Sequence, residues 1–159
     1  MVVMLIVMVA LGTIAGLTVI TVQGGATQMS VQRFSAMAMY AAESGAATTM
    51  AWLRTQHAAN HFTEALRNAA AIPGNGVQPG APGNLLSDDQ QGWYEVTLRN
   101  NPGDPQYTTN PDVDTDDDVI IQVTGYGPSG AMRRLEWEVR RDDAASVPGL
   151  VLVGWRDLF

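Results

Sequence analysis

The chain has 159 residues, a formal net charge of −7 and no cysteine. Its acidity disfavours binding to nucleic acid, which requires a basic face, so nucleic acid is not an expected partner. The absence of cysteine excludes disulfides and thiolate chemistry. The length is sufficient for one modest domain together with one long helix.

The first segment of the chain is apolar and uncharged. No charged side chain precedes Arg33, and residues 1–22 are almost wholly apolar, which is about the length that crosses a bilayer core as a helix. The segment lacks the basic start of a secretory signal peptide and the flanking charges that orient a single-pass anchor. We therefore expect Met1 to be a processed N-terminus, from which a basic leader has been removed. An ordinary membrane anchor is the alternative interpretation.

Two pairs of glycines lie in or just after this segment. Gly12 and Gly16 are four residues apart, the spacing that lets two helices approach closely in lipid. Gly24 and Gly25 follow the apolar stretch and predict a kink or weak point. Residues 1–25 are therefore expected to form a helix that packs against copies of itself and can unwind locally.

Helical signals continue over residues 26–72. No proline occurs from Gln28 to Ala71, and Gly45 is the single glycine in that stretch. Apolar residues recur at helical spacing and form a loose stripe: Met29, Met37, Ala41, Ala42, Ala46, Met50, Leu53, Ala65 and Leu66. We expect an amphipathic continuation of the first helix that packs under a globular head.

The rest of the chain predicts an antiparallel sheet. Residues 73–92 are rich in proline and glycine at their start and are expected to form a surface loop. Residues 93–159 contain three alternating segments, at 93–99, 119–125 and 131–141, and the last two are separated by a Gly-Pro-Ser-Gly turn. Residues 149–155 could be a fourth strand or a tail that docks on a neighbour. The expected class is α+β, with one long helix across a small sheet.

An acidic segment precedes the second of these strands. Its carboxylates alternate and then run together, at Asp112, Asp114, Asp116, Asp117 and Asp118. Such spacing supplies several of the oxygen ligands that Ca²⁺ prefers, and Asp104 and Asn110 could complete the shell. The EF-hand pattern does not fit, because its sixth position requires glycine and is aspartate here. A calcium loop and a solvated acidic turn both remain open, and no other cofactor is expected.

Other candidate chemistry is sparse. His57, His61 and Glu64 could share one helical face and hold a metal ion, although no fourth ligand is evident. A solvated helix surface is the alternative. No nucleophile motif or phosphate-binding loop is present, and the chain is not expected to be an enzyme.

One stretch carries a family resemblance. The run Ala41-Ala42-Glu43-Ser44-Gly45, which follows an apolar N-terminus, resembles a motif of the PilX-type minor pilins in the type IV pilin superfamily. The resemblance implies a subunit that waits in the bacterial inner membrane and is then extracted into an extracellular helical filament used in adhesion or motility. Its implied partners are copies of itself and other pilins.

The chain departs from that family at two points. Most type IV pilins have glutamate at the fifth mature position, where this chain has Leu5, and many have a C-terminal disulfide that this chain lacks. The departures favour a minor or tip subunit over a major pilin. A type II secretion pseudopilin and a monomeric membrane-anchored periplasmic binding domain are the alternatives. The tail residues Trp155, Leu158 and Phe159 could form a subunit contact or fold onto their own head.

Overall fold

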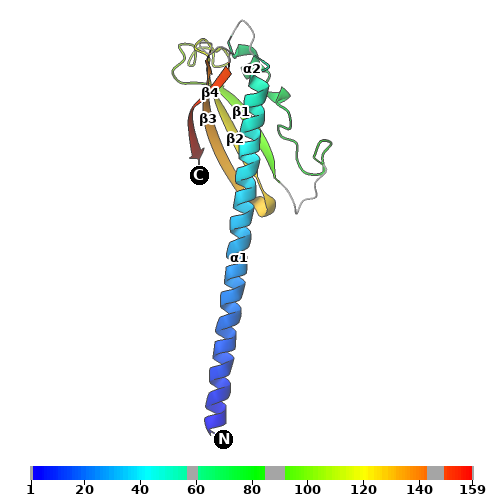
Figure 1. Ribbon diagram of the computed structural model, residues 1–159, viewed down its shortest axis with the longest axis vertical. Coiled ribbons are helices and arrows are strands. Elements are labelled where there is room, and N and C mark those ends of the chain that lie inside the picture. Colours follow the sequence, from blue (N-terminus) through cyan, green and yellow to red (C-terminus); the bar gives the residue numbers. More distant parts are fainter. Residues whose placement is uncertain (1, 57–60, 85–91, 143–148, 159) are drawn as a thin grey trace. The chain divides into compact units, whose positions relative to one another are not determined.

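The computed structural model describes residues 2–56, 61–84, 92–142 and 149–158 (Figure 1). Within residues 2–10, only Met4 and Met8 have described side chains. The chain is α+β, as expected, with helix α1 at Val2–Leu53 followed by a four-stranded antiparallel sheet. In the described part of the chain, no helix is both long enough and apolar enough to cross a membrane.

The chain divides into two compact units, Met1–Phe34 and Ser35–Phe159. In the first unit α1 is uninterrupted, and it passes through Gly24 and Gly25 without the expected kink. Glycine lowers helix propensity by roughly 1 kcal/mol relative to alanine but removes no backbone hydrogen bond, so the helix can continue. The hydroxyls of Thr18 and Thr21 donate to carbonyls of the preceding turn, at 2.8 Å in each case.

The sheet belongs to the second unit and has the strand order β1-β2-β3-β4. Its strands are β1 at Trp93–Asn100, β2 at Asp118–Tyr126, β3 at Met132–Asp142 and β4 at Gly149–Leu158. Every neighbouring pair is antiparallel, and β3 and β4 pair with an irregularity between Glu138 and Val139. The three expected strands are therefore confirmed, and the final apolar segment is a fourth strand of the same sheet.

Residues 35–53 of α1 lie across one face of this sheet (Figure 1). Alternate positions of the strands face the helix, as expected from their period of two. The buried core is formed by small residues of α1 and branched residues of the strands: Ala42, Ala46, Leu53, Val96, Leu98, Val119, Ile121, Val123, Leu135 and Val139. Trp137 of β3 is partly buried against this core.

Two glycines set how closely α1 approaches the sheet. A Cβ atom on Gly45 would lie 2.7 Å from the ring of Tyr94 and 2.8 Å from Val123. A Cβ atom on Gly125 in β2 would lie 2.1 Å from the carbonyl oxygen of Ala38. Both distances are shorter than carbon and oxygen atoms tolerate, so only glycine permits this packing.

The long helix ends earlier than the sequence predicts. The expected continuation over residues 26–72 is wrong beyond Leu53, because short helices α2 at Thr63–Arg67 and η1 at Ala69–Ala71 follow a break. The helix breaks because of a tertiary contact made by Phe62. The side chain of Phe62 is completely buried, and its backbone N–H donates to the carboxylate of Asp114 at 2.8 Å. Burial of a large aromatic ring outweighs the small helix propensities of the intervening residues.

The loop that begins at residue 73 forms turns in its described part, residues 73–84, as expected. Gly74, Gly76, Gly80 and Gly83 all have positive φ angles there, which residues with a Cβ atom rarely adopt. The turns bring the loop back alongside β1.

Candidate functional site

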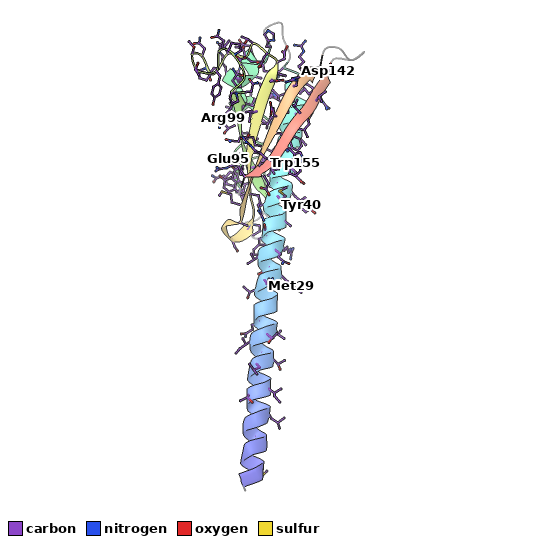
Figure 2. All side chains as sticks on the ribbon, turned by 90° about the vertical axis from the view of Figure 1, so that its left-hand side faces the viewer. Met29, Tyr40, Glu95, Arg99, Asp142 and Trp155 are labelled. Atoms are coloured by element: carbon purple, nitrogen blue, oxygen red, sulfur yellow. The ribbon has the colours of Figure 1, made fainter. Side chains whose placement is uncertain are left out.

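The first candidate site is the surface of α1 in the unit Met1–Phe34. Its large apolar side chains are between 54% and 73% exposed over residues 11–31, as at Leu11, Ile14, Leu17, Ile20 and Met29. Figure 2 shows the side chain of Met29 projecting from the helix. Exposed apolar patches of this extent normally mark surfaces that another molecule or a membrane covers.

The four glycines predicted for helix packing have open surroundings. A Cβ atom added to Gly12, Gly16, Gly24 or Gly25 would meet no other atom within 4 Å. Among the described residues, their small size therefore serves no packing within the chain, in contrast to Gly45. The side chain of Leu5, the position at which the family has glutamate, lies outside those described.

The sequence predicts a subunit contact at three tail residues, Trp155, Leu158 and Phe159. Trp155 is 66% exposed at the outer strand of the sheet (Figure 2). Leu158 is half-buried and lines a shallow pocket with Met132, Arg133 and Arg134. Phe159 lies outside the described residues. Trp155 is thus the tail residue with a large free apolar surface.

The two outer strands of the sheet, β1 and β4, differ in whether other residues bond to their outer edges. The edge of β1 is partly covered, because the side-chain amide of Asn75 both donates to the carbonyl of Val96 at 3.1 Å and accepts from its N–H at 2.8 Å. The N–H of Gly76 adds a bond to the carbonyl of Tyr94 at 2.9 Å. At β4, no described residue pairs with the backbone on the side away from β3. Among the described residues, the sheet therefore has one partly covered edge and one open edge.

The second candidate site is the acidic loop before β2, which is centred on Asp114. Its side chain is 1% exposed, and its two oxygens accept backbone N–H bonds from Phe62, Asp116 and Asp117. Burial raises the pKa of this carboxyl to about 6, although the bonds from the backbone N–H groups oppose the shift. Asp114 thus fastens the start of α2 to the acidic loop.

Asp104 joins this site from the preceding turn. One of its oxygens accepts from the N–H of Gln106 at 2.5 Å and the other from the N–H of Thr115 at 2.6 Å. Burial acts to raise the pKa of Asp104, but these hydrogen bonds outweigh it and leave the pKa below its usual value. Oxygens of Asp104, Asp114 and Asp116 all lie within 4.8 Å of one another, so the three carboxylates could share a cation.

His61 forms a second group with the same loop. Its Nδ1 atom lies 2.9 Å from a carboxylate oxygen of Asp117, and both lie within 4.8 Å of an oxygen of Asp114. The bond to Asp117 raises the pKa of the imidazole. His61 and Asp117 both have positive φ angles, at 57° and 64°, which are uncommon for residues other than glycine.

The helical face on which His57, His61 and Glu64 could have held a metal ion does not form as considered. His61 precedes α2 in a left-handed backbone conformation and is not part of a helix, and Glu64 pairs with Arg67 at 3.6 Å. His57 lies outside the described residues. The error has a local cause, because the chain turns at His61 to bury Phe62.

The remaining members of the predicted calcium set lie elsewhere. Asp112 is exposed and belongs to neither group of potential ligands. Asp118 is buried and pairs with Arg140 across the β2–β3 hairpin, with Nε and Oδ1 separated by 2.6 Å. Asn110 bonds to Gln106 in its own turn. The hydrogen bonds at Asp104 and Asp114 explain their positions as braces of the loop, and calcium binding stays a prediction.

Comparisons with known proteins identify no relative: no family model, curated protein or solved structure matches the chain. The candidate sites must therefore be interpreted from their own geometry.

Proposed function

We propose that the chain is a structural subunit of a pilin-like filament, in which copies assemble by packing the helix of residues 2–34. The observation that carries the proposal is the exposed apolar surface of α1 between Leu11 and Val31. Water contact with so much apolar surface is unfavourable by about 25 cal/mol per Å², so the surface is expected to be covered by lipid or by other helices.

The surroundings of the glycines support helix packing rather than lipid contact alone. Gly12 and Gly16 lie four residues apart on one helix face and are not used by any contact within the chain. Small residues at this spacing allow two helix backbones to approach closely. In the filament, Gly12 and Gly16 would be contact points between copies, and Gly24 and Gly25 would allow local unwinding.

The unit Ser35–Phe159 would form the outer surface of the filament. Its layout, a helix across a four-stranded antiparallel sheet, is consistent with a pilin head. The proposal includes the inner membrane as the location of the subunit before assembly and the cell surface afterwards. Other pilins would be further partners, and no catalytic role is assigned to the head.

The experiment is cryo-electron microscopy of filaments sheared from cells that express the chain, together with mass spectrometry of its N-terminus. We expect helical filaments whose density fits α1 in the core and the sheet outside. Recovery of the chain only from membranes, with no filament containing it, would refute the proposal and favour a monomeric anchored domain.

A further inference from the structure

The helix α1 carries one pair of opposite charges. Arg33 and Glu43 are its only charged residues between Val2 and Leu53, and they are ten positions apart in the sequence. Both side chains are exposed, and neither forms an ion pair within the part of the chain that the structure describes. If copies of α1 pack together, each charge loses water and requires a partner of opposite sign.

Glu43 lies at an apolar groove of the unit Ser35–Phe159. The groove has a volume of about 250 Å³ and lies between α1 and strands β3 and β4. Its lining consists of Met39, Glu43, Leu135, Trp137, Leu152 and Trp155. Glu43 is the single charged residue of this lining. The groove therefore offers apolar and aromatic walls and one carboxylate.

Arg33 lies at the end of a complementary strip. Val22, Ala26 and Met29 precede it by eleven, seven and four positions and share its face of the helix. Val22 is 66% exposed and Met29 is 73% exposed. The strip therefore combines apolar side chains with one guanidinium, which matches the composition of the groove with the charge reversed.

We propose that this groove receives α1 of a second copy, and that Arg33 of the second copy pairs with Glu43. The inference rests on the proposed filament function and names its register: neighbouring copies are shifted by the ten positions that separate the two charges. The two contacting surfaces are different, so the contact is heterologous and repeats from copy to copy instead of closing a dimer. Trp155, beside Glu43 in the groove, would cover the aliphatic part of the arginine.

Disulfide cross-linking tests the register directly, because the chain has no cysteine of its own. The double variant Arg33→Cys with Glu43→Cys, assembled by removal of detergent and then oxidised, is expected to give a ladder of covalent multimers. Ten helical residues span about 15 Å, whereas a disulfide requires Cα atoms within roughly 7 Å, so the two cysteines of one copy cannot bond to each other. The matched control is Arg33→Cys with Ser44→Cys, since Ser44 is exposed but points about 100° away from Glu43.

Charge exchange tests the pairing without cysteine. Arg33→Glu and Glu43→Arg are each expected to weaken self-association by about tenfold, because each places like charges together. The double exchange is expected to restore association to near the wild-type value, measured by sedimentation. A ladder specific to positions 33 and 43, together with this rescue, supports the contact.

The two proposals fail in distinguishable ways. If the wild-type chain assembles but the ladder or the rescue is missing, the Arg33–Glu43 contact is overturned and the filament proposal stands. If the wild-type chain shows no self-association under any detergent-removal condition, both proposals are overturned.

Discussion

Gly125 of β2 lies so close to α1 that a methyl group in its place would be 2.1 Å from the carbonyl oxygen of Ala38 and 2.4 Å from the backbone nitrogen of Ala42. Both neighbours are helix backbone atoms, which cannot move aside as the end of a flexible side chain can. The separation between helix and sheet is thus fixed at this point by the absence of a side chain.

We expect Gly125→Ala to destabilise the unit Ser35–Phe159 by about 3 kcal/mol, because the added carbon must push α1 away from the sheet. Urea unfolding followed by tryptophan fluorescence measures this, since all four tryptophans lie in that unit. Gly24→Ala is the matched control. Its surroundings are open, so its effect on this unfolding is expected to be nil. Equal stability of the Gly125→Ala variant would show that the close approach is not required.

For Gly12 and Gly16 in α1, we expect substitution to weaken assembly without changing the stability of the sheet unit. Gly12→Leu with Gly16→Leu is expected to leave the unfolding of the sheet unit unchanged, because a Cβ atom added at either position would meet no atom within 4 Å beyond its own helical turns. Assembly is expected to weaken by at least tenfold, since the bulky side chains keep neighbouring helices apart. Fluorescence energy transfer between labelled copies in detergent micelles measures the association.

Thr18→Leu is the control for this pair, because it adds bulk on the opposite face of the same helix. Association of the double leucine variant as strong as that of the wild-type chain would exclude Gly12 and Gly16 from the contact.

The buried carboxyl of Asp114 predicts a pH dependence of stability. Its folded pKa of about 6 lies above the ordinary value of 3.8, so the folded state holds the proton more tightly than the unfolded state. This contribution is therefore fully present below about pH 4 and is lost as the pH rises through 6. Asp114→Asn removes it, and the stability difference between wild type and variant is expected to be larger at pH 4 than at pH 7, by on the order of 2 kcal/mol.

Urea unfolding at a series of pH values measures this difference. Asp112→Asn is the control, since Asp112 is exposed and lies outside both acidic groups. A difference that does not change between pH 4 and pH 7 would contradict the assignment of the raised pKa to Asp114. His61 contributes to stability with the same sign. Its contribution is lost at a higher pH, because its pKa is raised from an ordinary value of 6.5.

Asn75 predicts a stabilising role for the covered edge of β1. Asn75→Ala removes both hydrogen bonds to the backbone of Val96 and is expected to destabilise the sheet by about 2 kcal/mol. Asn75→Asp keeps the acceptor for the N–H of Val96 but loses the donor to its carbonyl, so an intermediate effect is expected. Hydrogen exchange at the amide of Val96 measures the opening, and unchanged protection in Asn75→Ala would contradict the role.

The sheet was predictable because its signals are local. Alternation of apolar residues marks β2 and β3, and the turn at 127–130 fixes their antiparallel pairing. The same register places Asp118 opposite Arg140, so their ion pair could have been inferred by counting outward from the turn. Treating Asp118 as a calcium ligand overlooked this partner.

The end of α1 and the arrangement of the acidic loop were not predictable in the same way. The bond between the N–H of Phe62 and Asp114 joins residues 52 positions apart. No local sequence pattern predicts this bond, and the segment before Phe62 contains no proline or glycine that would end a helix. The left-handed conformation of His61 follows from that distant contact and not from the preferences of histidine.

The unequal edges of the sheet limit how copies can join through their strands. Asn75 and Gly76 bond to the outward backbone groups of Tyr94 and Val96 in β1, whereas β4 has no such cover among the described residues. We expect a strand-to-strand junction between two copies to use β4, because no described residue covers its outer backbone groups. Endless cross-strand ribbons require two free sheet edges on every copy, so the bonds from Asn75 and Gly76 to β1 work against them even when the copies are crowded.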